Sequence, residues 1–350
     1  MKAFSAHPLV SIAIPTYSRL RYLKEAVASA LAQDYPNIEI IIGDDGRTDA
    51  IHEWSEALAR REPKVRYQRN EHNLGLAGNW NALADAARGE FMVMIGDDDR
   101  LLPEFVSTLL AMMPFDAQVG FSNHYLIDGQ GERLEAEGQQ LTRQYHRHLL
   151  NAGEVASVEA CVWRNSIPMS AALVRTDAIK RLRFKEDLNT PEIELFARLA
   201  QAGGRLFFTP QYLSEYRVHP QSATASGLWG ERLVKYLQPI QVSPDVEPLK
   251  RKFMSSLLVS AVDDCLRRRA RDMALQYFAD AYYPRPGWRN VKSLSQWLCL
   301  GLPAFIGLPL YQHLHRIKSA MRSLGSMGVK VKKRLGPKVM RSADLKAQLQ

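Results

Sequence analysis

Short runs of β-branched and other apolar residues alternate with helical patterns over the first hundred residues, and this alternation constrains the fold more than any other feature. The pattern predicts strands at residues 10–14, 38–42, 64–67 and 90–94, and helices at 22–33, 50–60 and 79–87. A crossover helix returns the chain to the end of the sheet where it began, so such alternation favours parallel strands. The sequence therefore predicts an α/β fold with a mainly parallel, Rossmann-like sheet flanked by helices.

Polar stretches directly follow three of the expected strands. They are Pro15-Thr16-Tyr17, Gly43-Asp44-Asp45-Gly46 and Gly96-Asp97-Asp98-Asp99. Ligands of parallel sheets bind beyond the carboxyl ends of the strands, so we expect these stretches to meet at one edge. Three successive carboxylates repel one another, and a divalent cation shared with phosphate oxygens would offset that repulsion. Three aspartates in a row are also typical of a solvated turn, and only their convergence with the other stretches favours a binding site.

Six segments, in the same order, resemble the family 2 glycosyltransferases of the GT-A fold over about residues 8–222. They are VSIAIPTYSR (10–19), IEIIIGDDGRTD (38–49), NEHNLGLAGNWN (70–81), RGEFMVMIGDDDRLLP (88–103), PEIELFARLAQAG (191–203) and YRVHP (216–220). The resemblance implies a GT-A fold and an inverting enzyme that moves a sugar from a nucleotide donor to a hydroxyl group, and a UDP-sugar is the expected donor. It also implies that the cofactor is Mn²⁺ or Mg²⁺.

The resemblance places the nucleotide pocket at the ends of the first two strands. It implies that Tyr17 stacks on a uracil-type base, next to Pro15, and that Asp45 accepts the ring N–H of that base. Asn73 belongs to a turn that the family packs beside the nucleotide. Without the family, the residues favour a half-buried tyrosine at a strand end for Tyr17 and a turn former before Gly46 for Asp45.

In the family's Asp-x-Asp signature, the metal-binding aspartate falls on Asp98. Gly96 stands where the commonest pattern has its first aspartate, which is a departure from the family. Asp97 then occupies the middle position and is expected to face the ribose or a metal-bound water. His219, in the closing Tyr-Arg-Val-His segment, is expected to add a metal or diphosphate contact. A lone histidine is otherwise more often solvated or bonded in the core.

Glu192 falls at the position of the family's catalytic base. Direct transfer with inversion needs one carboxylate to take the proton of the acceptor hydroxyl. Pro191 suits a first helical turn, which would place Glu192 at the mouth of a helix, where a carboxylate is also common simply because it complements the helix dipole. The resemblance assigns Trp163 and Arg217 to the acceptor side, although Arg217 is equally compatible with a distant ion pair.

The positive charge of the chain is concentrated at its end. The formal net charge is +9, yet residues 285–350 hold thirteen Lys or Arg against Asp344 alone, which leaves residues 1–284 mildly acidic. Residues 294–310 are uncharged, and prolines and glycines interrupt them. We therefore predict a catalytic domain at 1–225, a helical extension at 226–290 and, at 291–350, an apolar and basic tail that lies on an anionic membrane. A core-packed helix followed by a solvated tail is the alternative.

The leading hypothesis is thus a glycosyltransferase with a glycan or lipid-linked acceptor, acting in surface polysaccharide biosynthesis. The expected location is the cytoplasmic face of the inner membrane, because Cys161, Cys265 and Cys299 show no paired spacing. Nucleic acid is not expected as a partner, since the tail lacks interleaved aromatic residues. An inactive, glycosyltransferase-like scaffold that recruits assembly proteins is the alternative. A dinucleotide-binding oxidoreductase is remote, because no Gly-x-Gly-x-x-Gly turn follows the first strand.

Overall fold

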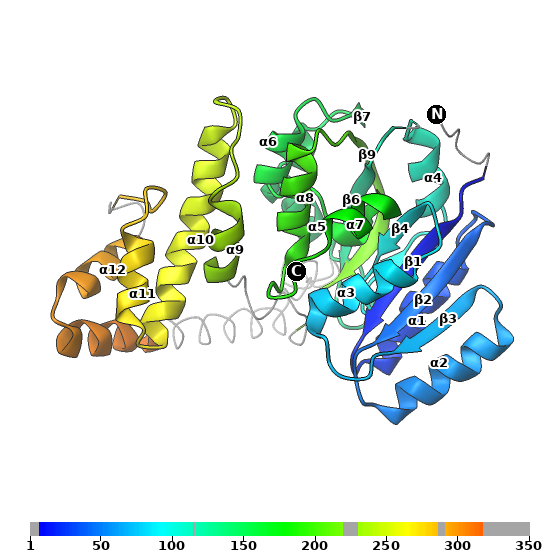
Figure 1. Cartoon of the computed structure of the whole chain (residues 1–350), viewed down its shortest axis with the longest axis horizontal. Helices are drawn as coiled ribbons and strands as arrows, with labels where there is room; N and C mark the ends of the chain where they lie inside the picture. Colours follow the sequence, from blue (N-terminus) through cyan, green and yellow to red (C-terminus); the bar gives the residue numbers. More distant parts are fainter. Residues whose placement is uncertain (1–6, 115, 220–229, 286–290, 318–350) are drawn as a thin grey trace, which may run out of the picture. The chain divides into compact units, whose positions relative to one another are not determined.

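The computed structural model describes residues 7–114, 116–219, 230–285 and 291–317 (Figure 1). The chain divides into two compact units, residues 1–257 and 258–350, and the division falls inside helix α10 (Glu247–Arg267). Each unit is described by itself. The predicted boundaries at residues 225 and 290 stay predictions.

The first unit is built on one sheet, and its described residues contribute nine strands in the order β3-β2-β1-β4-β8-β6-β9-β5, with β7 paired to β9. The strands are β1 (Val10–Thr16), β2 (Ile38–Asp44), β3 (Val65–Arg69), β4 (Phe91–Met94), β5 (Arg100–Leu101), β6 (Val119–Ile127), β7 (Gly153–Glu154), β8 (Ala172–Arg175) and β9 (Leu206–Arg217). The sequence pattern therefore gave the four N-terminal strands correctly.

Parallel pairing holds the half of the sheet that carries the polar stretches. Strands β3, β2, β1 and β4 are all parallel, and Thr16 at the end of β1 pairs with Asp44 at the end of β2. The predicted mainly parallel sheet is confirmed. Strand β8 departs from it, because it runs antiparallel between β4 and β6. Strand β9 is parallel to β6, so both end on the same side of the sheet.

Helices flank the sheet of the first unit (Figure 1). They are α1 (Leu20–Leu31), α2 (Asp49–Arg61), α3 (Gly75–Ala86), α4 (Phe105–Met112), α5 (Glu135–Gln144), α6 (Val158–Trp163), α7 (Thr176–Leu182), α8 (Pro191–Gln201) and α9 (Gly230–Leu237), with short 3₁₀ turns η1 (Arg147–Leu149) and η2 (Met169–Ala171).

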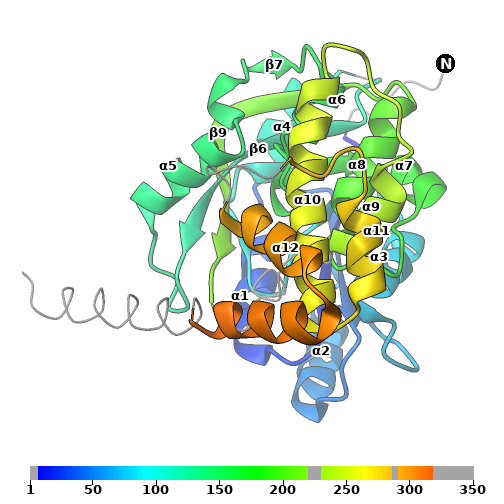
Figure 2. The same ribbon diagram turned by 90° about the vertical axis from the view of Figure 1, so that its left-hand side faces the viewer.

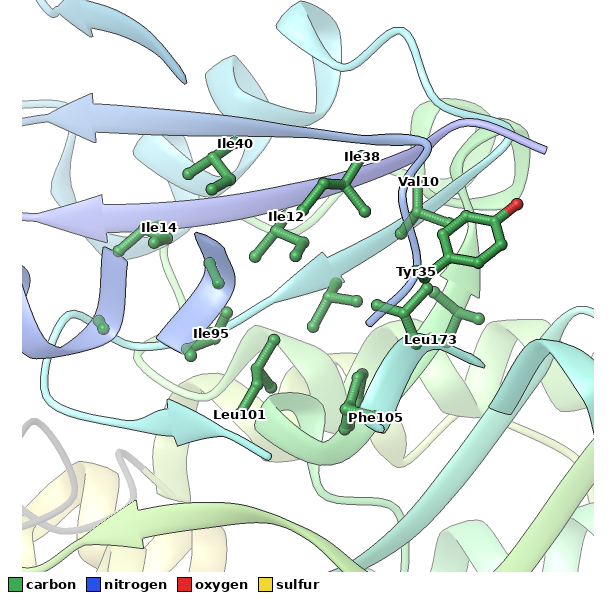
Figure 3. Packing of buried hydrophobic residues seen from close by; sticks show 14 of the residues in the cluster. Val10, Ile12, Ile14, Tyr35, Ile38, Ile40, Ile95, Leu101, Phe105 and Leu173 are labelled. Carbon is green, nitrogen blue, oxygen red and sulfur yellow. The ribbon is translucent and has the colours of Figure 1, made fainter. Parts of the chain in front are cut away.

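Alternate residues of β1 and β2 form the main hydrophobic core. Ile12, Ile14 and Ile40 point to one face, where they pack with apolar residues of α1, α2 and α4 such as Phe105 (Figure 3). Each of these side chains is fully removed from water, which contributes roughly 1.5–3 kcal/mol apiece. Gly43 lies on the opposite face, where a Cβ would come within 2.8 Å of Leu83 of α3. Glycine is therefore what lets α3 approach β2 closely.

The second unit consists of the end of α10, α11 (Arg271–Phe278), α12 (Val291–Gly301) and a helical stretch at residues 304–317 (Figure 2). Buried polar groups join them: Gln296 donates to the Val259 carbonyl at 2.8 Å and Tyr311 donates to Asp263 at 2.5 Å. The uncharged stretch 294–310 thus forms two helices. Across the described residues, no helix combines the length and apolar character that crossing a bilayer requires. Residues 318–350 of the predicted tail lie outside the described residues.

Candidate active site

The three polar stretches meet at the carboxyl edge of the parallel strands. Asp45 donates its backbone N–H to the Thr16 carbonyl at 3.0 Å, and Ile95 donates to Ala13 at 3.1 Å. These bonds extend the ladder by one residue beyond each strand, so the loops start side by side. Gly46 completes the junction, because a Cβ there would lie 1.8 Å from the carbonyl oxygen of Tyr17.

Asp45 fixes the start of helix α3. Its carboxylate accepts hydrogen bonds from the backbone N–H groups of Leu74 (2.8 Å) and Gly75 (2.9 Å) and from the Asn70 side chain (3.0 Å). A carboxylate offers about four acceptor positions, so these bonds leave room for about one more donor. Asp45 is therefore held rigidly while it keeps the capacity to accept a base N–H, although it is only 5% exposed.

The other residues assigned to the nucleotide lie around this loop. The Tyr17 ring is 56% exposed, as a stacking surface for a base would need to be. Pro15 is part of β1 and pairs with Gly43. Asn73 accepts a hydrogen bond from the Gly75 backbone at 2.7 Å, which shapes the turn before α3. Their nucleotide contacts stay predictions.

Asp97 is buried at the edge of the sheet. Its carboxylate accepts a hydrogen bond from the Thr16 hydroxyl at 2.8 Å and forms an ion pair with Arg19. Burial raises the pKa of Asp97 to about 6, against the opposing effect of the Arg19 charge. The Arg19 guanidinium is therefore the nearby positive charge that favours the ionised carboxylate.

Asp98 and His219 converge on one point. Asp98 Oδ2 lies 2.9 Å from His219 Nε2, and Arg19 Nη1 lies 2.7 Å from the first atom and 3.1 Å from the second. Within the described residues, no three His, Cys, Asp or Glu side chains form a group that could hold a metal ion by themselves. One carboxylate and one imidazole nevertheless fit a cation such as Mg²⁺ or Mn²⁺, which takes its remaining ligands from a diphosphate and water.

Arg217 holds the loop of residues 96–99 that follows β4, called the aspartate loop below. Its side chain is fully buried, and it donates from Nε to the Asp98 carbonyl at 2.7 Å and from Nη2 to Glu25 at 2.5 Å. Its backbone N–H donates to Asp99 at 2.9 Å. In this structure Arg217 thus holds the loop in place, and the predicted acceptor contact stays untested. Burial and the neighbouring Asp98 raise the pKa of Asp99 well above its usual range.

Two glutamates at the start of α8 have different environments. Glu194 is bound through both oxygens by Arg198, at 2.5 and 2.6 Å. Glu192 lies one residue beyond Pro191 at the helix start, and burial raises its pKa to about 7. A carboxylate with a pKa near neutrality is suited to general base catalysis, whereas Glu194 is neutralised by its partner. No hydrogen bond or ion pair between described residues joins Glu192 to the aspartate loop.

The sequence matches a known family over much of this sheet. Residues 11–161 fit the profile described as "Glycosyl transferase family 2". This chain contains a family 2 glycosyltransferase domain. The matched residues include Thr16, Asp45 and Asp98, whereas Glu192 and His219 lie beyond them.

Two curated relatives are glycosyltransferases of bacteria. The GalNAc(5)-diNAcBac-PP-undecaprenol beta-1,3-glucosyltransferase of Campylobacter jejuni is 23% identical over 303 residues, which cover 86% of this chain and 91% of that protein. Glycosyltransferase GlyG of Streptococcus pneumoniae is 35% identical over 121 residues, but these span only 34% of this chain and 40% of GlyG. The enzyme class is therefore a glycosyltransferase.

Two solved structures share the fold at low sequence identity. TarS residues 1–349 of Staphylococcus aureus, in complex with UDP-GlcNAc, superpose with a TM-score of 0.58 and 16% identity, covering 83% of this chain and 90% of that one. The mannosyltransferase PcManGT of Pyrobaculum calidifontis, in complex with GDP-Man and Mn²⁺, gives a TM-score of 0.55 and 16% identity, covering 91% and 88%. The predicted GT-A fold is confirmed.

One tryptophan of the glycosyltransferase, Trp163, is buried, whereas Trp80 is half-buried. Trp163 on α6 is 4% exposed and meets the ring of Phe253 edge-on, with the centroids 5.9 Å apart. The Trp80 ring packs against Phe184 in the same way at 5.1 Å. In this structure the buried Trp163 ring offers no open face for stacking on a sugar, and its acceptor role stays a prediction.

Arg19 and Thr16 are the functional residues that the sequence reasoning missed. Both lie in the segment that carries the family resemblance, yet neither received a role. The signal that could have found them is their position. Thr16 ends a strand whose neighbours lead into acidic loops, and a cation three residues further on can reach those carboxylates. The pairing itself joins residues about eighty positions apart.

Proposed function

We propose that this protein is a metal-dependent inverting glycosyltransferase that moves a sugar from a nucleotide donor, a UDP-sugar, to a hydroxyl of a glycan or lipid-linked acceptor. The observation that carries the proposal is the contrast between Glu192, whose pKa is raised to about 7, and Glu194, which Arg198 neutralises. Of these two carboxylates at the start of α8, Glu192 is therefore the one that is suited to accept a proton. The exposed Tyr17 ring and the spare acceptor position of Asp45 support a pocket for the nucleotide base at the ends of β1 and β2.

In the proposed reaction, Glu192 removes the proton of the acceptor hydroxyl while its oxygen attacks the anomeric carbon of the donor. The bond from that carbon to the diphosphate breaks, and the nucleoside diphosphate leaves with the bonding electrons. Asp98 and His219 would hold the divalent cation, which supplies positive charge that stabilises the leaving diphosphate. Arg217 and Thr16 keep the aspartate loop in position through the bonds described above. Asp45 and Tyr17 orient the base.

A lipid-linked acceptor in surface polysaccharide biosynthesis is the proposed substrate class. One support is the Campylobacter relative, whose name describes a glucosyltransferase acting on an undecaprenol-diphosphate glycan and which matches 86% of this chain. The second support is the surface of the C-terminal unit. Trp297, Leu298, Phe305 and Ile306 are between 45% and 79% exposed there, and residues 291–317 contain no acidic side chain. Both features suit contact with an anionic membrane on its cytoplasmic face.

The base assignment is tested by the substitution Glu192→Gln. We expect it to lower transfer by at least about a hundredfold, because the amide keeps the size of the side chain but cannot accept the proton. Purified protein is assayed for product with a panel of nucleotide sugars, Mn²⁺ and lipid-linked acceptors. Glu53→Gln, on the exposed side of α2, is the matched control and should retain activity. Transfer by Glu192→Gln at the wild-type rate would refute the assignment, and no transfer by any form would favour an inactive scaffold.

A further inference from the structure

Arg19 occupies the point on which the proposed metal ligands converge. The residue immediately precedes helix α1, and its guanidinium bridges two carboxylates, with Nη2 on Asp97 and Nη1 on Asp98 at 2.7 Å. Its side chain is 24% exposed, whereas the carboxylates of Asp97 and Asp98 are 2% and 11% exposed. The carboxylates are thus covered by a cation that itself retains access to solvent.

His219 Nε2 makes two close contacts that cannot both be hydrogen bonds. Its Nε2 atom lies 3.1 Å from Arg19 Nη1, which is a donor, and 2.9 Å from Asp98 Oδ2, which is an acceptor. A ring nitrogen can donate or accept, but it cannot do both. One of the two close approaches is therefore not a good hydrogen bond. A cation in place of the guanidinium nitrogen would accept electron pairs from the carboxylate and from neutral Nε2 together.

The charges at the edge of the sheet also indicate that a cation could replace the Arg19 guanidinium. Asp97, Asp98 and Asp99 follow one another and are all nearly buried, so they need positive charge close by. Arg19 supplies one charge to Asp97 and Asp98, while Arg217 binds the backbone beneath them. A divalent cation that enters beside Arg19 would face the repulsion of the guanidinium. The cation and the guanidinium therefore compete for the same carboxylates.

We propose that Arg19 is an internal counter-ion. Its guanidinium occupies the cation position until the donor binds, and the side chain then moves to form an ion pair with the donor diphosphate. This inference rests on the proposed function, and it deepens that function by linking the binding of the metal ion to the binding of the nucleotide. Metal alone binds weakly because it must displace Arg19. A nucleoside diphosphate offers the guanidinium a new anionic partner, since arginine binds phosphate through two parallel hydrogen bonds. Metal and nucleotide consequently strengthen each other's binding.

The experiment is a titration of the full chain with Mn²⁺, in which free Mn²⁺ is followed by electron paramagnetic resonance, first without nucleotide and then with UDP or GDP. For Arg19→Gln we expect Mn²⁺ alone to bind about tenfold more tightly than to wild type, a difference of about 1.4 kcal/mol. The gain in Mn²⁺ affinity on adding nucleotide should shrink, because binding couplings are reciprocal. Arg19→Lys, which keeps the charge but loses the bidentate fork, should fall between the two.

Two controls separate this inference from the proposed function. Arg21→Gln removes a neighbouring arginine that is 69% exposed and should leave Mn²⁺ binding unchanged. Asp98→Asn should abolish Mn²⁺ binding at this site. If Asp98→Asn abolishes binding and Arg19→Gln leaves it unchanged or weaker, the counter-ion role of Arg19 is wrong and the metal site stands. If Asp98→Asn binds Mn²⁺ like wild type, the metal site is wrong, and the inference is wrong with it. Arg19→Lys provides the measurement should Arg19→Gln not fold.

Discussion

Glu192 is the residue whose protonation should set the pH dependence of the enzyme. Its pKa is raised to about 7 because burial disfavours the charged form, and the base must be ionised to accept a proton. We expect kcat/KM to rise about tenfold per pH unit below pH 7 and to level off above it. Initial rates at saturating Mn²⁺ measure this profile. An inflection close to 4.5, the ordinary pKa of glutamate, would show that Glu192 is not held in this state.

The same pKa shift should be visible in stability. A carboxyl group with a raised pKa in the folded state favours folding below its ordinary pKa, and that contribution is lost as the pH rises through about 7. Replacing Glu192 by Gln removes the group, so the melting temperature of Glu192→Gln relative to wild type should increase from acidic to alkaline pH. Melting curves on both sides of pH 7 test this, with exposed Glu53→Gln as the control. A constant difference across the range would contradict the expectation.

At the level of elements, the sequence predicted the parallel half of the sheet best. Strand 38–42 became β2 (Ile38–Asp44) and helix 50–60 became α2 (Asp49–Arg61). Strands buried on both faces are continuous apolar runs, and this signal is local. The antiparallel insertion of β8 between β4 and β6 was not predicted, because such pairing joins Phe91 to Arg175 across more than eighty residues. No pattern within β8 itself indicates its neighbours.

The candidate site, too, could be predicted from the sequence only in part. Motif positions located Asp45, Asp98 and Glu192 on the loops and the helix that the structure describes. The burial of the site residues and their hydrogen-bond and ion-pair partners could not be predicted from the motif positions. For Arg217 the sequence left open both a role on the acceptor side and an ion pair with a distant carboxylate. In the structure its side chain is 0% exposed and binds Glu25 and the Asp98 carbonyl. Arg19 had no assigned role because its partners lie on β4's loop, far along the chain. Both roles depend on which strands are neighbours.

Arg217 connects three elements, and this makes it a test of how the aspartate loop is held. It joins the end of β9 to α1 through Glu25 and to the loop after β4 through the Asp98 carbonyl. Replacing Arg217 by Leu leaves the Asp98 carbonyl without this donor and removes the shortest ion pair of Glu25, which keeps the 3.7 Å approaches of Arg21 and Arg100. We therefore expect a loss of about 1–3 kcal/mol in the free energy of unfolding. Mn²⁺ affinity should also fall, because the Asp98 backbone loses its support.

The matched control is Arg133→Leu. Arg133 also pairs with a glutamate, Glu215, at 2.7 Å, but it is 38% exposed, and exposed ion pairs contribute about 0–1 kcal/mol. Urea denaturation and Mn²⁺ titration of the two variants decide the point. Equal losses of stability in Arg133→Leu and Arg217→Leu would show that the buried arginine does not support the loop.

At the scale of the whole molecule, the C-terminal unit bears on where the enzyme works. Exposed apolar side chains recur along residues 304–317 at positions 306, 310, 314 and 317, a spacing that places them along one side of a helix. The neighbouring helix α12 adds Trp297 and Leu298. Residues 291–317 contain no acidic side chain, and the sequence continues into a Lys- and Arg-rich stretch. An apolar stripe in such a segment is typical of a helix that lies in the surface of an anionic membrane.

We therefore expect the full chain to sediment with vesicles rich in phosphatidylglycerol and to bind phosphatidylcholine vesicles much more weakly. Phe305→Asp should reduce the bound fraction several-fold at moderate salt, because it places a charge on the most exposed apolar side chain of the C-terminal unit, which is 79% exposed and precedes the stripe residue Ile306. Leu149→Asp, which is 56% exposed but belongs to the first unit, is the control and should bind like wild type. Transfer to a water-soluble acceptor analogue should be unchanged in Phe305→Asp, which keeps membrane contact separate from catalysis. If Phe305→Asp binds as well as wild type and salt alone releases both, the basic residues suffice and the exposed apolar side chain of Phe305 does not enter the membrane.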